Sequence, residues 1–476
     1  MATLKFIIDL FGSTILVPVV VFILALFLKV ELRKAARAAI NMAVGLTAFN
    51  AIVSVLLGNL GPVVTEMVEH AGVNLPALDI GWSAAAIIVY SNRMGMLFIP
   101  FGLLLNFALF LLKWTDSFQP TDIWNYYHFT FWGIIVELAT GSTWLGVAAA
   151  IMGMLWSLLF ADWLAPSLQT YYGYNGVTLT AYGDNVMTPW AILCKWVLNK
   201  LGLLDRIKLD PETLKEKFGF FGDPLMIGLV VGGAVTIVAK YHALGSAETW
   251  ALVLKTAAIT AAVMIIYPSI SGLFVRGLTP ISQTLNERIR RGEIKRKDFY
   301  IGIDPAVFFG EQATLATGLV LIPIFLLCAI FLPGNKVLPL ADIAALPFFA
   351  APAIAVMRGN VFGAAITLGI WLIFGLYANS DIAAIFTQAA AAVGAVPADV
   401  GSLYVTSIVV GKNPIGWLVY KAFSAPGAIR WVTIALMVGV YLVTYFLFQR
   451  NRKAWQMAAG APEEYFQEQS AGADTL

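Results

Sequence analysis

The sequence predicts an all-α, polytopic membrane protein of about 11 transmembrane helices, arranged as two inverted repeats of five spans with re-entrant hairpins, plus one extra C-terminal helix. Three observations support this fold class. Of the 476 residues, 59% are hydrophobic and only 12% are charged, whereas a soluble domain carries about 25% charged residues. Apolar runs long enough to cross a bilayer recur along the chain. Finally, motifs of the first half return in the second half in the same order.

The first half opens with Ile7–Leu28, an apolar run that is long enough to span and has no basic region before it, so it is expected to remain uncleaved. Lys and Arg residues between positions 29 and 37 follow it. Short loops rich in these residues face the cytoplasm, so the N-terminus is expected outside. Ala39–Leu57 is the second span, and Met96–Leu112 is the next clear span, after an outer loop (58–80) without Lys or Arg.

Three other stretches of the first half are too polar or too irregular to be free spans. Asp79–Gly95 is interpreted as a re-entrant, cavity-lining piece, and Asp122–Gly146 mixes ionisable residues with tryptophans. Beyond a span over Val147–Phe160, the stretch 162–184 is rich in Tyr, Gly, Asn and Thr. Such backbone survives at membrane depth only when it is buried in protein or lines a cavity. The basic stretch Asn199–Asp223 is expected to be a cytoplasmic linker.

The second half is expected to contain five more spans before a final one at 431–448. A basic stretch, 276–297, should lie along the inner surface, and the basic residues from Arg450 to Lys453 place the C-terminus inside. Lys412, Lys421 and Arg430 fall on the outer side in this topology, against the charge rule. The expected spans are 225–239, 251–267, 312–332, 342–357 and 361–377, followed by a broken region at 378–421.

The internal repeat is visible as matched motifs at offsets of 218 to 225 residues. Ile99-Pro100 matches Ile322-Pro323, Asp122 matches Asp342, and Gly141 matches Gly359. The basic loops place the starts of the two repeats on opposite sides, which makes the repeat inverted. We therefore divide the chain into a first repeat (1–203), a cytoplasmic linker (204–223), a second repeat (224–427), and a final helix with a cytoplasmic tail (428–476).

The stretch Asp122–Gly146 is the predicted centre of a substrate site. Ionisable groups at membrane depth usually face a cavity or a partner and mark a substrate path. Carboxylates and amides beside indole rings suit a polyhydroxylated ligand, because the polar groups bind hydroxyls while the rings cover C–H faces. The alternative is an interfacial tryptophan belt. Inverted-repeat transporters bind substrate where the repeats meet, so residues of both halves are candidates.

The candidate substrate ligands are Asp79, Trp82, Asn125, His128, Glu137, Asp304, Glu311 and Gln312, and the candidate supporting residues are Trp124, Ser142, Arg358, Asn360 and Asn413. Glu137 and Glu311, one from each repeat, are expected to grip hydroxyls from opposite sides or to share a proton. Other roles remain open for several residues. Asp79 and Asp304 are equally suited to capping helices, Arg358 to pairing or snorkelling, and Asn413 to shaping its turn.

No cofactor or metal is expected. Cys194 and Cys328 lie in apolar runs without disulfide or metal-ligand spacing. The net charge of +2 comes without a basic block that would suggest nucleic acid. Because the chain shows neither metal-ligand spacing nor a nucleophile–base pair, an intramembrane enzyme is the weakest of the functional classes.

Ordered motifs across nearly the whole chain resemble the galactitol-type IIC permease of the sugar phosphotransferase system (PTS), in the ascorbate–galactitol superfamily. They are DxGW at Asp79–Trp82, DIWNxxHFTF from Asp122, LATGS at Leu138–Ser142, KFGxFGDP at Lys217–Pro224, GLTPI at Gly277–Ile281, IGIDPA at Ile301–Ala306, LPGNxVLPxxD at Leu332–Asp342 and RGN at Arg358–Asn360.

This resemblance implies a homodimer in the bacterial inner membrane. Each protomer would have a scaffold domain (roughly 1–78 and 224–300) and a core transport domain that moves like an elevator. It also implies transfer of the substrate to a separate cytoplasmic IIB protein, phosphorylated in turn by IIA, so phosphoryl transfer lies outside this chain. Where the galactitol-type pattern has histidines, this chain has Glu137 and Glu311. A related polyol or sugar therefore fits as well as galactitol. The alternative function is a proton-coupled or facilitative secondary transporter of the same fold.

Overall fold

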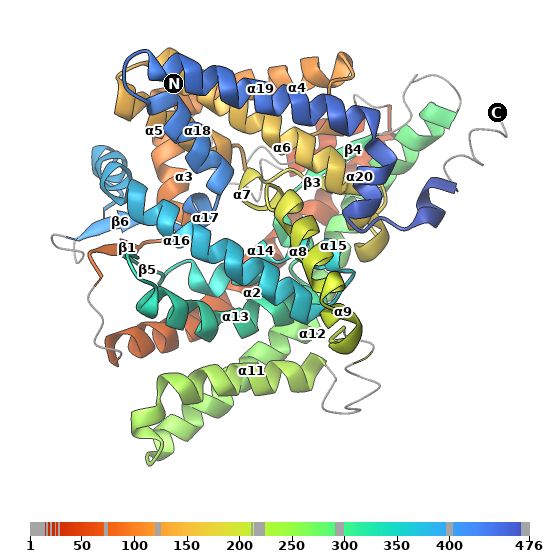
Figure 1. The fold of residues 1–476 in the computed structure, drawn as a ribbon. Helices are drawn as coiled ribbons and strands as arrows, with labels where there is room; N and C mark the ends of the chain where they lie inside the picture. Colours follow the sequence, from red (N-terminus) through yellow and green to blue (C-terminus); the bar gives the residue numbers. More distant parts are fainter. Residues whose placement is uncertain are drawn as a thin grey trace.

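The protein is described by a computed structural model that covers residues 29–70, 75–119, 125–210, 224–290, 299–396 and 403–467, with Thr213 and scattered positions from 15 to 26. Helices make up most of these residues, and six short strands lie among them (Figure 1).

The elements of the first half are α2 (Leu32–His70), β1 (Ala77–Asp79), α3 (Trp82–Ser91), α4 (Arg93–Leu111), β2 (Ser117–Phe118), α5 (Tyr127–Thr140), α6 (Thr143–Tyr172), β3 (Val177–Leu179), α7 (Tyr182–Asn185), α8 (Thr188–Lys200) and α9 (Leu203–Arg206).

The elements of the second half are α11 (Pro224–Ala239), η3 (Tyr241–Ala243), α12 (Ala247–Arg290), β4 (Tyr300–Ile303), η4 (Pro305–Val307), α13 (Gln312–Phe331), β5 (Val337–Leu338), η5 (Ile343–Ala345), α14 (Leu346–Phe349), α15 (Ala351–Met357), α16 (Val361–Ala392), β6 (Tyr404–Thr406), α17 (Ile408–Gly411), α18 (Pro414–Ser424), α19 (Ile429–Arg450) and α20 (Arg452–Ala458).

Within the described residues, five helices are long and apolar enough to cross a membrane: α4, α6, α13, α16 and α19. Most of the expected first span, Ile7–Leu28, lies outside the described residues. The second expected span is part of α2, which begins at Leu32, so the basic residues from Arg33 to Arg37 belong to a helix instead of a loop. The expected span at 251–267 is likewise part of the longer α12.

Two long helices extend further than the sequence predicted. Helix α6 continues through 162–172, which was expected to be irregular, and α16 continues to Ala392 through the start of the expected broken region. Their starts are alike. A left-handed glycine ends the preceding helix or turn (Gly141, φ 69°; Gly359, φ 85°). A polar side chain then caps the new helix, Ser142 accepting from the Leu145 N–H and Asn360 from the Gly363 N–H.

The expected span at 342–357 is wrong, because this stretch is divided into η5, α14 and α15. Pro347 and Pro352 stand in the first turns of α14 and α15. Proline has no N–H and clashes with the preceding turn, so it is tolerated at a helix start and breaks a helix interior. The segment is therefore a chain of short pieces packed inside the protein.

The six strands form two small parallel sheets, and each sheet combines both halves of the chain. In the first, β1 of the first half lies between β5 and β6 of the second half. In the second, β4 of the second half lies between β2 and β3 of the first half. Because all the pairings are parallel, the carboxyl ends of strands from both halves meet at two places.

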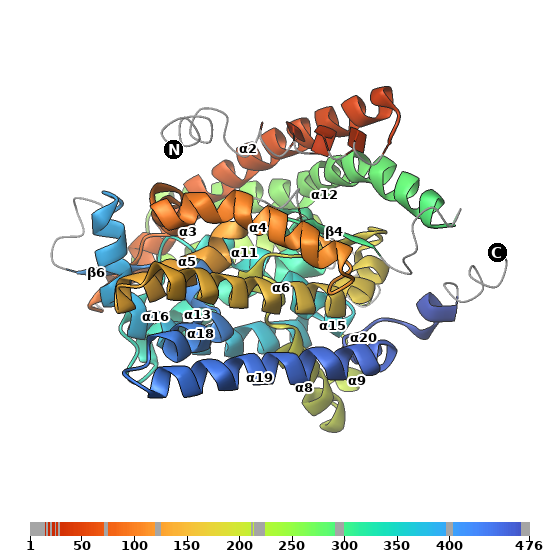
Figure 2. The ribbon, with the colours of Figure 1, turned by 90° about the horizontal axis from the view of Figure 1, so that it is seen from above.

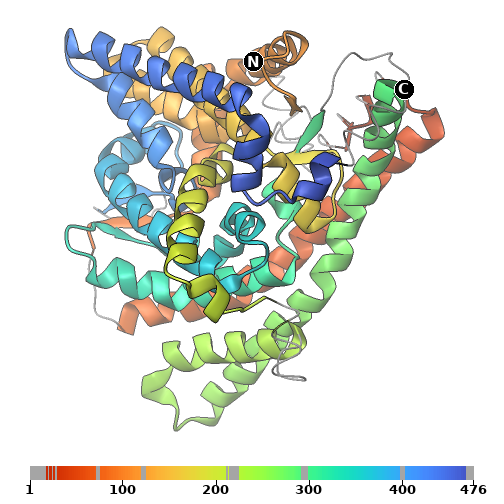
Figure 3. The same ribbon diagram turned by 45° about the vertical axis from the view of Figure 1, so that its right-hand side comes forward.

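Helices α2, α11 and α12 pack on one another as a group, and α2 lies beside α12 over much of its length (Figures 2 and 3). Their contacts are close. A Cβ atom added at Gly232 of α11 would lie 2.5 Å from the Thr260 Oγ1 of α12, and one at Gly277 of α12 would lie 3.0 Å from the Ala38 carbonyl oxygen of α2. Small residues allow this approach of helix backbones.

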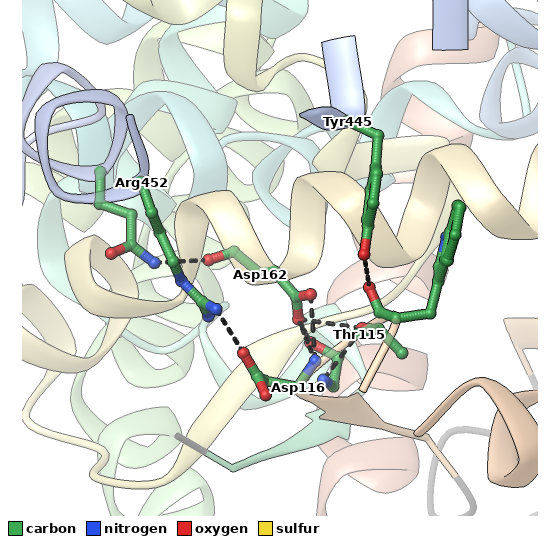
Figure 4. A network of polar contacts seen from close by, with 8 residues as sticks. Thr115, Asp116, Asp162, Tyr445 and Arg452 are labelled. Carbon is green, nitrogen blue, oxygen red and sulfur yellow. Dashed lines mark hydrogen bonds and ion pairs between the residues drawn. The ribbon is translucent and has the colours of Figure 1, made fainter. Parts of the chain in front are cut away.

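The C-terminal helices are attached to the core by polar contacts with α6. Arg452 pairs with Asp116, whose backbone N–H donates to the carboxylate of Asp162 (Figure 4). Tyr445 donates to the Trp114 carbonyl at 3.0 Å and stacks on its ring. Helix α20 is thereby held across α6, where Gln456 donates to the Asp162 carbonyl at 2.9 Å.

Candidate functional site: two sheet ends and an ion pair in the core

Asp79 ends β1 and binds backbone from three parts of the chain. Its carboxylate accepts N–H groups from Gly81 (3.2 Å), Leu340 (3.2 Å), Asp342 (2.7 Å) and Ile408 (3.2 Å). These donors follow β1, β5 and β6, whose carboxyl ends meet here. Both oxygens of this buried carboxylate therefore hold the backbone of the two halves together. Asp79 does not cap α3, whose N-cap is Gly81.

Asp342 completes this sheet end. Its carboxylate accepts the Trp82 N–H at 2.8 Å, the Val409 N–H at 3.1 Å and the Ser407 hydroxyl at 2.7 Å. The indole of Trp82 is 39% exposed. The sequence matched Asp342 to Asp122 but did not include it among the site residues, and Asp122 lies outside the described residues. The repeat match itself was the signal that pointed to Asp342.

The second sheet end joins two of the predicted ligands. Asp304 follows β4, accepts the Ala306 N–H at 2.7 Å and also accepts the Asn125 side-chain amide at 2.6 Å. Asn125 comes from the first half and Asp304 from the second. The structure thus brings together an amide and a carboxylate that the sequence placed in one site, and Asp304 is also a cap.

His128 is the second residue of α5, its side chain buried and its ring stacked on Tyr127 with centroids 4.2 Å apart. Among the described residues, its Nδ1 atom has no hydrogen-bond partner. A Cβ atom added at Gly183 would lie 2.5 Å from this nitrogen, so α7 lies directly against this side of the ring. A buried imidazole nitrogen without a partner is unusual, because most buried polar atoms are bonded.

Glu311 is the N-cap of α13. It accepts the N–H groups of Ala313 (3.0 Å) and Thr314 (2.8 Å) and the Tyr171 hydroxyl (2.9 Å). Gln312 follows it as the first residue of α13 and is half-buried. Arg358 lies over the Tyr171 ring at 5.6 Å and donates to Thr170 instead of pairing with Glu311.

Glu137 and Glu311 do not lie together, contrary to the expectation that they share a site or a proton. Glu137 lies in the last turn of α5 and accepts the hydroxyl of Thr143, the first residue of α6. Glu311 contacts Tyr171, which is 28 residues further along the same helix. At 1.5 Å per residue, these two contacts are about 40 Å apart along α6.

The supporting residues mostly stabilise helix starts. Ser142 caps α6, Asn360 caps α16 and donates to the Ile207 carbonyl at 2.9 Å, and Asn413 caps α18 and donates to the Tyr182 carbonyl at 3.1 Å. Trp124 lies outside the described residues. Asn413 therefore shapes its turn, which is one of the roles that the sequence left open for it. Its hydrogen bond to the Tyr182 carbonyl also connects that turn to the first half.

The sequence missed a buried ion pair between the halves. The Lys412 ammonium lies 2.7 Å from the Asp184 Oδ1 atom, with the two side chains 1% and 3% exposed. Lys412 was expected to lie at the outer surface, where it counted against the topology. It is instead inside the core, so it no longer conflicts with the charge rule. One sequence feature could have indicated this ion pair. Lys412 and Asp184 lie in the broken segments that follow β6 in the second half and β3 in the first half.

Within the residues that the structure describes, no cluster of three or more His, Cys, Asp or Glu residues could hold a metal ion. The polar groups brought together are carboxylates, amides, an imidazole and tyrosine hydroxyls. Groups of these kinds bind hydroxyl-rich molecules by direct hydrogen bonds.

Comparison with known proteins matches this arrangement to a family. Residues 6–399 match the family described as "PTS system sugar-specific permease component". The galactitol-specific EIIC component of the PTS from Escherichia coli K12 is 31% identical over 95% of this chain and 97% of its own length. The chain belongs to the PTS sugar-specific permease family.

A second relative from Escherichia coli K12, a putative permease IIC component, is 31% identical over 93% of this chain and 98% of its own length. Both relatives are matched along almost their whole length, so the resemblance to galactitol-type IIC permeases is confirmed. As a PTS permease of this kind, the chain is a membrane protein and a transporter subunit, in line with its five apolar helices.

Proposed function

We propose that this chain is the IIC component that binds a galactitol-like polyol or related sugar and moves it inward for phosphorylation by a separate IIB protein. The observation that carries the proposal is the near full-length match to a galactitol-specific EIIC component, together with a hydroxyl-binding set of residues from both halves. One side of the proposed site is formed by Asn125, His128 and Asp304. The other side is formed by Glu311 and Gln312, which follow Asp304 in the same segment of the second half.

The proposed site is narrower than the set of candidates taken from the sequence. Asp79 holds the backbone with both oxygens, so its role in the proposal is to fix the sheet end near the site. Glu137 stands outside the proposed site, because it lies at the far end of α6 from the contact of Glu311. At Glu137 and Glu311 this chain has acids where the galactitol-type pattern has histidines. For this reason we propose only a class of substrate, a polyol or a sugar.

The fold is proposed to be an inverted repeat. Its support is the exchange of strands, in which β1 lies between two strands of the second half and β4 between two strands of the first. Helices α4 and α13 also correspond. Each begins with a side-chain cap, Asn92 or Glu311, that accepts two backbone N–H groups, and each carries an internal proline. The count of 11 spans, the inner membrane and the orientation of the termini belong to the same proposal.

Helices α2, α11 and α12 are proposed to be the scaffold of a homodimer, and the remaining elements its moving core. Their tight packing on one another through Gly232 and Gly277 supports a rigid group. Movement of the core past this scaffold would carry the site across the bilayer. The alternative is a secondary transporter of the same fold, which needs no IIB protein.

Reconstitution tests this function. Proteoliposomes containing the protein are given a panel of labelled polyols, with or without the IIB protein and a phosphoryl donor. We expect phosphorylated product only when both proteins are present, and slow, non-concentrative uptake without IIB. Concentrative uptake of free polyol under a pH gradient alone would support the secondary transporter and contradict the IIC function.

A further inference from the structure

Lys412 places a cation where three broken helices meet. Its ammonium donates to the Gly183 carbonyl at 2.6 Å and to the Asp184 carboxylate at 2.7 Å, and it lies 4.0 Å from the centre of the Phe349 ring. Gly183 and Asp184 belong to α7, Phe349 to α14, and Lys412 follows α17. All three helices are four-residue pieces after a strand.

The contacts around this ammonium are those of a small cation site. A carbonyl oxygen, a carboxylate and an aromatic face are the groups that hold monovalent cations in proteins, and the ammonium itself has three N–H donors. In ion-coupled carriers, interrupted helices near the midplane offer carbonyls and helix ends to Na⁺ or H⁺. Here the corresponding position is occupied by a side chain of the protein.

The enclosure leaves little space beside the lysine. A Cβ atom added at Gly375 of α16 would lie 2.7 Å from the Lys412 Cα atom, and one at Gly183 would lie 2.5 Å from His128. The side chain of Lys412 is only 1% exposed. The ammonium is therefore enclosed by protein, and Gly183, whose carbonyl it binds, lies against His128 of the proposed substrate site.

We propose that Gly183, Asp184 and Phe349 form a monovalent-cation site that Lys412 permanently fills. A soluble ion in this position would bind and leave with each transport cycle, so its gradient would drive transport. A tethered ammonium links the two halves in the same way but cannot leave. Removal of the ammonium therefore exposes a site that takes up a small cation from solution.

The substitution Lys412→Ala tests this site directly. The purified variant is melted in a buffer whose only cation is tetramethylammonium, which is bulky and has no N–H donor. Na⁺, K⁺ or methylammonium is then added. We expect the melting temperature of Lys412→Ala to rise with at least one small cation, methylammonium most readily, while the wild type melts at the same temperature in every salt.

Lys421→Ala is the matched control. Lys421 also pairs with an aspartate, Asp381, at 2.6 Å, but the two side chains are 44% and 37% exposed. This variant should melt like the wild type in every salt. A Lys412→Ala variant that melts at one temperature in all four salts would overturn the proposal, because loss of packing alone gives no selectivity among cations.

The melting measurement uses no IIB protein and no transport assay. Failure here would leave the IIC function untouched, and absence of a phosphorylated product would leave the cation site untouched.

Discussion

The core and the three-helix group α2–α11–α12 hold their helices together in different ways. In the core, buried carboxylates accept backbone N–H groups from distant segments, as Asp79 does from Leu340 and Ile408. In the three-helix group, glycines let backbones approach, and the ion pair of Lys240 with Glu66 is partly exposed.

This difference follows from what each part must bury. The core contains strands and short helices whose free N–H and carbonyl groups lie inside the protein, so each needs a partner. A continuous helix satisfies its own backbone and needs only surface contact. Broken backbone is also where inverted-repeat transporters bind their ligands, so the costly polar network and the proposed site coincide.

The largest effect is expected at Asp79. Asp79→Ala leaves four buried N–H groups without their acceptor, and each such loss costs about 1–3 kcal/mol. We therefore expect a loss of at least about 4 kcal/mol, seen as a failure to elute as a single species in detergent. Asp381→Ala, at a partly exposed ion pair, should cost less than about 1 kcal/mol. Equal stability of the two variants would contradict the role given to Asp79.

A smaller effect is expected in the three-helix group, where neighbouring glycines provide a matched pair. A Cβ atom at Gly232 would meet Thr260 Oγ1 at 2.5 Å, whereas one at Gly233 would meet Ala257 and Val253 at 3.7 and 3.8 Å. Gly232→Ala should cost about 1–3 kcal/mol by overpacking. Gly233→Ala should be neutral or stabilising, because alanine is the better helix former. Melting curves that rank the two variants in the opposite order would exclude close α11–α12 packing at Gly232.

The smallest of the three effects is expected where α20 meets α6. Arg452→Ala removes the cation beside Asp116 and Asp162 (Figure 4). Because the Arg452–Asp116 pair is partly exposed, we expect a cost of about 1–2 kcal/mol. Limited proteolysis should then release the C-terminal segment faster. Lys453→Ala, at the more exposed pair with Glu463, should leave the rate unchanged, and equal rates for both variants would refute the attachment.

Much of the fold and part of the candidate site could be predicted from the sequence. Charge content indicated a membrane protein, and the matched motifs with Asp122 and Asp342 located the corresponding segments of the two halves. The candidate site residues Asn125 and Asp304 were chosen because polar groups at membrane depth usually face a cavity or a partner. The matched glycines at 141 and 359 lie just before the starts of α6 and α16 in the structure.

The remainder depended on three-dimensional contacts. Hydropathy cannot separate a free span from short pieces packed in protein, so the stretch 342–357 was taken for one helix. Lys412 resembled a surface charge because its partner Asp184 is 228 residues away. Glu137 and Glu311 were paired by chemistry alone, and only the length of α6 shows how far apart they lie.

The central claim is that the substrate is bound where the two halves meet at Asn125 and Asp304. Equilibrium binding of the labelled polyol to purified variants tests it most directly. A hydrogen bond to a charged group contributes about 1.5–3 kcal/mol, so Glu311→Gln should weaken binding about tenfold to a hundredfold. A neutral hydrogen bond contributes about 0.5–1.5 kcal/mol, so Asn125→Ala should weaken binding about twofold to tenfold. Glu137→Gln should bind like the wild type. Normal binding by Asn125→Ala together with a tenfold loss in Glu137→Gln would contradict the account and place the site at the opposite end of α6.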